Sequence, residues 1–410
     1  MSFTGSNGGI GSAGDVTVAS VGTIVTRGQN SHGIFAQSAG GRGAEEGEFD
    51  EALAAIGLDF NNRKEAEETI QEAIQDEKDG DNDPHKIAIF ENLLWGPDVE
   101  KTAVNLLDEL GWVDALKDMK GTSGDVVVTV GDSISALGND AYGIFALSHG
   151  ADGSGNVSID IEGGTVQAGT AVRVMGGVNN SLSIGELGGV VGLEGAWSQD
   201  SGFFEVSSEE NSYERSLGWA VVGGEGNESI HNSGVLTGSI NLGGGVNTLS
   251  NLSGGVFNSG GVVDLGYTNA LLNEGVLSVG AMEEIDSSSL VGNLTQEASG
   301  VLLITHDTLA LSADNLYTSG FAQLQGAVQV HSVNDGYATG SHSLNILSSA
   351  QGISVSDDLQ LVVKPSAVMS YSLNYPSAQE MFLQLDVDYT PGDEFNANTM
   401  AFGEYVEAIQ

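Results

Sequence analysis

Three aspartates at alternating positions form the most metal-like pattern in this sequence. Asp79, Asp81 and Asp83 lie in the phrase Asp79-Gly-Asp-Asn-Asp-Pro. Carboxylates spaced in this way begin the calcium loop of an EF-hand, which continues with Gly at position six and Glu at position twelve. Here those positions hold Pro84 and Phe90. We expect an acidic turn between two helices, with weak calcium binding as the alternative, and no other cofactor.

A serine beside an aspartate is the only pattern that suggests nucleophilic catalysis. Gly131-Asp-Ser-Ile resembles the GDSL phrase of a lipase and esterase family. A catalytic serine of this kind needs an exposed strand-to-helix turn and a histidine partner. The expected Asp-x-x-His phrase is absent, and Ser133 aligns with Thr23 inside an internal repeat. The chain is therefore predicted not to be an enzyme.

The remaining candidates for chemistry are scattered. The seven histidines show no metal-ligand spacing. Asp and Glu residues brought together by the fold could form the carboxylate pair of a polysaccharide lyase or glycosidase, so a carbohydrate-active enzyme is the competing class. Four aromatic residues are close enough in sequence to share a side loop, where loop packing is the simpler interpretation: Trp197, Phe203, Phe204 and Trp219.

The charge and the cysteine count limit the partners. The formal net charge is -44, from 56 acidic and 12 basic residues. Such a surface repels nucleic acid and anionic lipid, and it is typical of a soluble, self-repelling exterior. The absence of cysteine excludes disulfides and thiol chemistry. The first residues have neither the basic nor the apolar region of a secretory signal.

An internal repeat indicates the architecture. Residues 14–40 align without a gap to residues 124–150, so that Asp15 matches Asp125 and Gly33-Ile-Phe-Ala matches Gly143-Ile-Phe-Ala. Each copy alternates apolar and polar residues in short runs separated by glycine, as strands and turns do. Such a unit buries its apolar side only by stacking on its neighbours. We therefore predict a mainly β fold, an elongated right-handed parallel β-helix.

A second phrase predicts the corners of this solenoid. An Asn-x-Gly step precedes an apolar run at Asn232, Asn258 and Asn273. Asn and Gly tolerate left-handed backbone conformations, which tight corners require. In stacked coils their side chains can also hydrogen-bond to one another along the axis.

The segment between the two repeats has the periodicity of helices. Apolar residues recur at helical spacing around Leu53 and around Leu106, and Pro84 and Pro97 stand where helices begin. Residues 44–120 are therefore predicted to form a small α-helical insertion at one corner, with β-helix coils at 1–43 and 121–289. From residue 290 the glycines thin out, which indicates a C-terminal β cap over 290–395, and residues 396–410 read as the start of a helix.

Three segments resemble the passenger domains of bacterial autotransporters, the type V secretion family with pertactin-like β-helices. They are the phrase that runs from Gly28 through Gly33-Ile-Phe-Ala-Gln-Ser to Gly43, the Asn-x-Gly series, and residues 383–410. The resemblance implies an autochaperone-like role for 290–395 and a linker helix from 396. It also implies export across the outer membrane through a downstream barrel. A signal peptide and the barrel would then lie outside these residues.

Together these features predict a secreted or surface-displayed passenger that acts as a non-enzymatic adhesin. The expected partners are host or neighbouring-cell surface molecules, or other copies of the chain. Nucleic acid is excluded, and a membrane is reached only through the barrel that this sequence does not contain. The insertion at 44–120 is the candidate recognition module.

Overall fold

A computed structural model describes most of the chain outside the segment between the two repeats. The described residues are 12–29, 31–40, 121–138, 141–150, 152–193, 218–280, 284–334, 339–366 and 368–389, with Gly403 and Tyr405. The chain divides into two units. One comprises residues 1–14, 38–124 and 149–154, and the other comprises 15–37, 125–148 and 155–410. The second unit contains nearly all of the strands and is described first.

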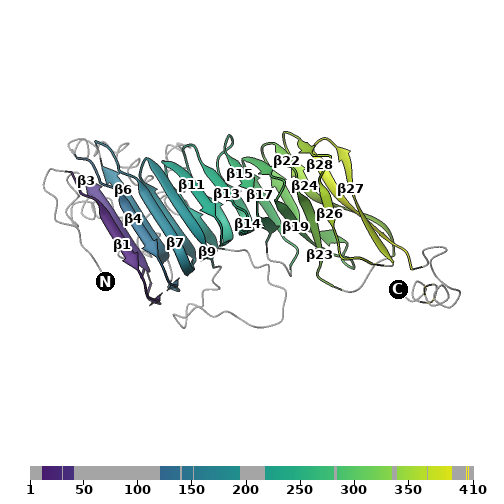
Figure 1. Cartoon of the computed structure of the whole chain (residues 1–410), viewed down its shortest axis with the longest axis horizontal. Coiled ribbons are helices and arrows are strands. Elements are labelled where there is room, and N and C mark those ends of the chain that lie inside the picture. Colours follow the sequence, from purple (N-terminus) through teal and green to yellow (C-terminus); the bar gives the residue numbers. More distant parts are fainter. Residues whose placement is uncertain are drawn as a thin grey trace, which may run out of the picture. The chain divides into compact units, whose positions relative to one another are not determined.

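The two sequence repeats are adjacent coils of one solenoid. Val16 pairs with Val126 and Ile24 with Ile134, both in parallel register. The backbone N–H of Asp125 donates to Oδ1 of Asp15, 2.9 Å away, although 110 residues separate them. The gapless alignment therefore arises because matching positions lie one above the other. Figure 1 shows this stacking continuing through the later strands.

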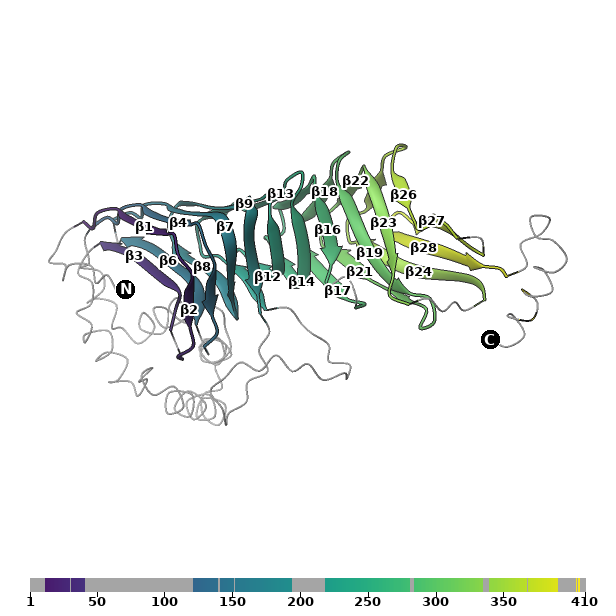
Figure 2. The same ribbon diagram turned by 60° about the horizontal axis from the view of Figure 1, so that its bottom comes forward.

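Each coil has three sides, and the strands on each side form a parallel ladder (Figures 1 and 2). We call these sides face 1, face 2 and face 3 in chain order. Face 1 comprises β1 (Val16–Ser20), β4 (Val126–Val130), the first parts of β7 (Val157–Ala168) and β9 (Asn179–Gly192), β11 (Asn227–Asn232), β13 (Thr248–Asn251), β15 (Ala270–Asn273), β18 (Asn293–Gln296), β22 (Ala322–Leu324) and β25 (Ile353–Val355).

Face 2 follows directly after face 1. It comprises β2 (Ile24–Thr26), β5 (Ile134–Ala136), the second parts of β7 and β9, the first parts of β12 (Val235–Asn241) and β14 (Val256–Asp264), β16 (Val276–Val279), β19 (Val301–Asp307), β23 (Ala327–Ser332) and β26 (Gln360–Val362).

Face 3 closes each coil. It comprises β3 (Ile34–Gly40), β6 (Tyr142–Gly150), β8 (Thr170–Gly176), β10 (Trp219–Val222), the second parts of β12 and β14, β17 (Ser287–Val291), β21 (Asn315–Thr318) and β24 (Gly340–Ser349). β20 (Ser312–Ala313) lies outside this pattern and pairs with β19 in an antiparallel turn.

The core runs along the inside of the coils. In β4 the residues alternate between buried and half-buried, because successive side chains of a strand point to opposite sides. The inward column of face 1 holds an apolar residue in every coil, for example Ile230 below Leu249 and Leu249 below Leu271. The prediction of a mainly β, parallel solenoid-like fold is confirmed at this level.

Coil length varies while the register of the strands does not. Ser229 and Thr248 are neighbours in adjacent coils 19 residues apart, whereas Ser135 and Gln167 are 32 residues apart. Most of the extra residues fall between face 2 and face 3, where β9 is followed by β10 and β23 by β24, or between β3 and β4. Turns between face 1 and face 2 stay short. At Gly164 the turn requires a φ of +71°, and a Cβ there would lie 2.4 Å from the carbonyl carbon of Asp132.

The C-terminal end departs from the coil pattern later than the sequence predicts. Parallel pairing continues beyond residue 290 as far as β25 and β26. The antiparallel part consists of β24, β28 (Glu380–Val387) and β27 (Met369–Ser377), with β28 between the other two. Glycine content is therefore a poor marker of the boundary, because the later coils keep the same ladders with fewer glycines.

Several predicted elements lie outside the described residues. They include the helical insertion at 44–120, the first eleven residues, and nearly all of 396–410, where Gly403 and Tyr405 have helical backbone. These assignments stay predictions. Among the described residues no helix is long and apolar enough to cross a bilayer.

Candidate functional site

A ladder of side-chain amides runs inside the solenoid at the end of face 1. Nδ2 of Asn232 donates to Oδ1 of Asn251, at 2.8 Å, and Nδ2 of Asn251 donates to Oδ1 of Asn273, also at 2.8 Å. Asn273 donates in turn to Oε1 of Gln296, at 3.1 Å. All four side chains are fully buried. Each amide also donates to a backbone carbonyl near the start of face 2, so the ladder closes this corner in successive coils.

The Asn-x-Gly prediction is therefore correct for Asn232 and Asn273 and wrong for Asn258. Asn258 follows the inward residue Phe257 directly, so its side chain points outward and donates to Oγ1 of Thr237, at 3.0 Å. Members of the ladder instead stand two residues after an inward residue, as Asn251 does after Leu249. The sequence interpretation missed Asn251 and Gln296 because neither is followed by the x-Gly step.

A second polar column occupies the corner between face 3 and face 1, and it contains a buried carboxyl group. Asn180, Glu228 and Asn247 occupy this corner in successive coils and are almost fully buried. Nδ2 of Asn180 donates to Oε1 of Glu228, at 3.1 Å, and the backbone N–H of Glu228 donates to Oδ1 of Asn247, at 2.9 Å. Glu228 thus takes a place in the column that its neighbours fill with amides.

The environment of Glu228 favours the neutral acid. Burial is the main cause that raises the pKa of its carboxyl to about 7, and the negative charge of Glu225 acts in the same direction. The hydrogen bonds from Asn180 and from the backbone of Gly224 lower the pKa, but their effect is smaller. Oε2 is buried and has no hydrogen-bond partner among the described residues. Among the described residues no other acid, base or nucleophilic side chain is hydrogen-bonded to this carboxyl group, so we assign Glu228 a structural role.

An aspartate, a histidine and a tyrosine come together near the C-terminal end, but their bonds do not form a catalytic relay. Nε2 of His306 lies 3.0 Å from the hydroxyl of Tyr371. Asp314 accepts the backbone N–H groups of Asp286 and Thr305, at 2.9 and 2.6 Å. Burial raises the pKa of Asp314 to about 7 and lowers that of His306 to about 4. Both side chains are fully buried, so no substrate reaches them.

Ser133 also has a structural setting. It lies in the turn between β4 and β5, and its Oγ accepts the backbone N–H of Thr165 from the next coil, at 3.1 Å. Ile24 pairs with Ile134, so Ser133 does stand one coil from Thr23. The exposed strand-to-helix turn that a lipase nucleophile needs is not formed here.

Replacing Ser133 by alanine should lower the free energy of unfolding by about 1 kcal/mol, because it removes one hydrogen bond. Chemical denaturation measures this loss.

The structure describes only one residue of the predicted calcium ligands and of the four clustered aromatic residues, Trp219. Asp79, Asp81 and Asp83 lie outside the described residues, as do Trp197, Phe203 and Phe204. Trp219 begins β10 on face 3, where its backbone N–H donates to the carbonyl of Gly169. Within the described part of the chain no three His, Asp or Glu side chains are grouped closely enough to hold a metal ion.

An aromatic stack that the sequence interpretation missed covers face 3 of the first two coils. His32 stacks on Tyr142 and Phe35 on Phe145, each with ring centroids 4.9 Å apart. Nδ1 of His32 also accepts the backbone N–H of Tyr142, at 3.0 Å, and burial lowers the pKa of this histidine. The signal was present in the repeat itself, because aromatic residues at matching positions of adjacent coils must lie one above the other.

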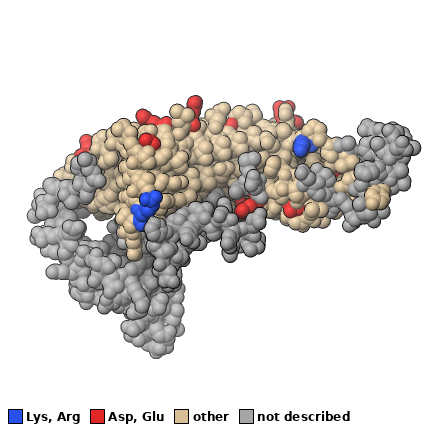
Figure 3. All heavy atoms as spheres, turned by 90° about the horizontal axis from the view of Figure 1, so that it is seen from below, with Lys and Arg blue, Asp and Glu red and all other residues tan. Residues whose placement is uncertain are grey.

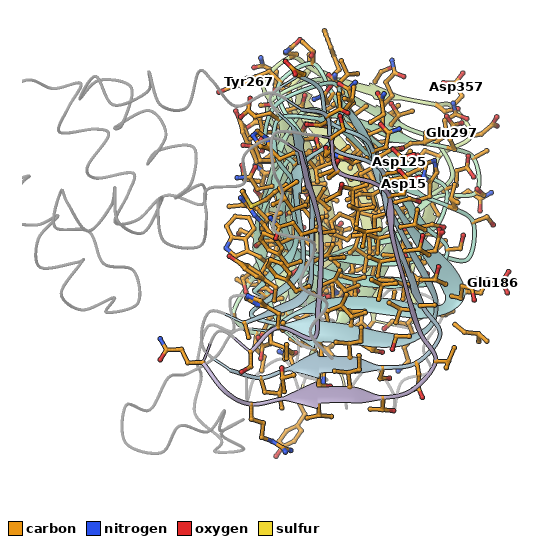
Figure 4. The ribbon with its side chains drawn as sticks, turned by 90° about the vertical axis from the view of Figure 1, so that its left-hand side faces the viewer. Asp15, Asp125, Glu186, Tyr267, Glu297 and Asp357 are labelled. Carbon is orange, nitrogen blue, oxygen red and sulfur yellow. The ribbon has the colours of Figure 1, made fainter. Side chains whose placement is uncertain are left out.

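Carboxylates line the outside of the solenoid at the turns from face 1 to face 2. Glu186, Glu297 and Asp357 lie on this side and point outward in Figure 4. On the face shown in Figure 3 the described surface carries several carboxylates and few basic residues. A basic patch of the kind that binds nucleic acid is not formed by the described residues, of which Arg27, Arg173 and Lys364 are the Lys and Arg members.

The described residues on either side of the segment 41–120 lie close together within the smaller unit. A Cβ added to Gly40, the last residue of β3, would lie 2.0 Å from the carbonyl oxygen of Thr122. That oxygen accepts the backbone N–H of Ala13, at 2.8 Å, and the backbone N–H of Gly124 donates to Oγ of Ser38, at 2.9 Å. The two residues that flank the segment, Gly40 and Gly121, are therefore brought close together within this unit.

Comparison with known proteins gives little further information. No protein-family model matches the chain, and no curated protein matches it. Among solved structures the chain is similar to the crystal structure of the Haemophilus influenzae Hap adhesin, with 13% identity and a TM-score of 0.31. The match covers 65% of this chain and 25% of that one, so the chain spans about a quarter of the length of the adhesin.

Proposed function

We propose that the chain is the exported passenger of a bacterial autotransporter and acts at the cell surface as a non-enzymatic adhesin. The resemblance in the repeat and in residues 383–410 supports the export route. The coils are proposed to be right-handed, because crossovers between parallel strands almost always take that sense. The role of 290–395 as an autochaperone-like region and of 396–410 as a linker helix belongs to the same proposal.

The observation that best supports the adhesin hypothesis is the close approach of Gly40 to the carbonyl group of Thr122. A segment whose ends adjoin can be carried on a solenoid without disturbing the strand register, and insertions on such repeats often form the binding surface. The coils would then be a scaffold that keeps residues 44–120 away from the cell. The partners would be molecules of a host or a neighbouring cell, or another copy of the chain.

Deleting residues 44–120 tests this assignment. Joining Gly43 to Gly121 should leave the β-sheet circular dichroism and the surface display of the parent protein unchanged, because the two flanking coils already stack in register. Attachment to cells or matrix should fall to the level of bacteria without the protein. The control is a deletion of residues 196–215, between β9 and β10, which should leave attachment intact. Equal attachment with and without 44–120 would refute the recognition role.

The proposed acidic turn at residues 79–84 has its own test. Calcium should be titrated calorimetrically into the whole chain and into a variant with Asp79, Asp81 and Asp83 replaced by asparagine. Because the loop lacks the Gly and Glu of a calcium site, we expect no saturable difference between the two below about millimolar calcium. A saturable heat that the triple variant loses would establish the weak calcium site instead.

A further inference from the structure

His306 lies inside the solenoid at its C-terminal end. It is on β19 and continues the inward positions of Leu302 and Ile304, so its ring occupies a place that earlier residues fill with aliphatic side chains. Its strand partners in register are Ser332 of β23 and Ala313 of β20. A fully buried imidazole at such a position needs a partner, because an unpaired polar group in a core costs free energy.

The partner comes from the terminal hairpin. Tyr371 is on β27, which pairs with β28, and β28 joins the hairpin to β24 of the last coils. The Tyr371 hydroxyl lies 3.0 Å from Nε2 of His306, and the two rings meet edge to face with centroids 5.5 Å apart. Nδ1 of His306 is buried and has no hydrogen-bond partner among the described residues. This contact therefore ties β27 directly to the core of the coils.

Neighbouring charged groups shift the protonation equilibrium of His306. Asp307 on the same strand favours a positive His306, and a positive charge on His331 of β23 opposes it. Asp314, which follows β20, accepts the backbone N–H groups of Asp286 and Thr305, and neither of these residues belongs to the hairpin. Burial of the ring is the largest influence, and it favours the neutral imidazole.

We propose that His306 and Tyr371 form an acid-sensitive latch that holds the terminal hairpin β27–β28 on the last coils. The docked hairpin requires an uncharged imidazole, because a second proton places a charge in the core, where Nδ1 has no acceptor among the described residues. When the hairpin opens, His306 reaches water and binds the proton freely. Acid therefore favours the open state, in which β24 loses its antiparallel pairing with β28.

The direction follows from proton linkage. The pKa of His306 is about 4 when docked and returns towards 6.5 when the ring is exposed. The open form therefore binds more protons, so the docked hairpin is lost progressively as the pH falls below 6.5. Between pH 6.0 and pH 4.5 the opening equilibrium should rise by roughly twentyfold.

Hydrogen exchange of the whole chain, followed by mass spectrometry at pH 6.0 and pH 4.5, tests the latch. After correction for intrinsic exchange, the protection of peptides from Met369–Ser377 and Glu380–Val387 should fall by roughly twentyfold in acid, whereas the protection of peptides from β4 should not change. Replacing His306 by glutamine should remove most of this acid response. Protection of β27 and β28 that is independent of pH in the natural chain would overturn the proposal, as would an unchanged acid response in the H306Q variant.

Two further variants keep the test decisive if H306Q folds poorly. Tyr371→Phe removes the hydroxyl but leaves the imidazole, so the hairpin should lose protection at both pH values and still respond to acid. His331→Gln removes the neighbouring positive charge and should reduce the acid response without abolishing it. An H331Q response equal to that of the natural chain, together with an unaltered hairpin in Y371F at pH 6.0, would show that the contact does not hold the hairpin.

Discussion

Replacing Asn251 by leucine should lower the free energy of unfolding by about 3 kcal/mol. The amide of Asn251 accepts from Asn232 and donates to Asn273 and to the carbonyl of Val276, and all of these groups are buried. Leucine has a similar volume but satisfies none of them, and each buried polar group left without its partner costs about 1–3 kcal/mol. Chemical denaturation followed by circular dichroism measures the loss.

Asn258 provides the matched control for this prediction. It belongs to the same kind of Asn-x-Gly phrase, but its side chain lies on the outer side and makes one hydrogen bond, to Thr237. Asn258→Leu should therefore cost no more than about 1 kcal/mol. Equal losses for the two substitutions would show that the internal ladder does not carry the stability that its geometry implies.

Replacing Glu228 by glutamine should have the opposite effect and stabilise the chain at neutral pH. The pKa of Glu228 is about 7 in the fold, above its ordinary value of 4.5, so the folded chain binds the extra proton. The protonated Glu228 contributes fully to the free energy of unfolding below pH 4.5, and this contribution is lost as the pH rises towards 7. Glutamine stays neutral, so at pH 8 it should raise the free energy of unfolding by roughly 1–3 kcal/mol.

The gain in the E228Q variant should shrink as the pH falls, because at pH 4 the natural carboxyl is already protonated. Denaturation curves of both chains at pH 4, 6 and 8 measure this convergence. Glu225→Gln is the control, since that residue is exposed and acts on Glu228 only through its charge. It should give a much smaller gain. A constant difference between E228Q and the natural chain at all three pH values would contradict the assignment of a raised pKa.

The repeated coils could be predicted from the sequence because they depend on local rules. Matching residues 110 positions apart indicate adjacent coils, and alternating apolar residues mark the inward side of β4. Only two of the four residues of the amide ladder, Asn232 and Asn273, could be predicted, because Asn-x-Gly identifies a corner but not the direction of the side chain. The better signal is an amide two residues after an inward apolar residue, which holds for Asn232 and Asn251 and excludes Asn258.

The buried ionisable groups could not be predicted in the same way. Glu228 and Asp314 look like surface carboxylates in a chain with 56 acidic residues, and only the stacking of distant coils places them inside. His306 and Tyr371 are 65 residues apart and meet because the terminal hairpin turns back over the coils. Their contact depends on the antiparallel pairing of β28 with β24, and no repeat in the sequence predicts this pairing.

The close approach of Gly40 to Thr122 also has a consequence for how such a chain can change over time. The parallel pairing of β1 with β4 uses no residue of 41–120, so mutations in that segment do not have to preserve this pairing. A recombination event that replaced the whole segment would then leave this pairing intact. The solenoid would remain under a separate and slower constraint, set by its amide ladders.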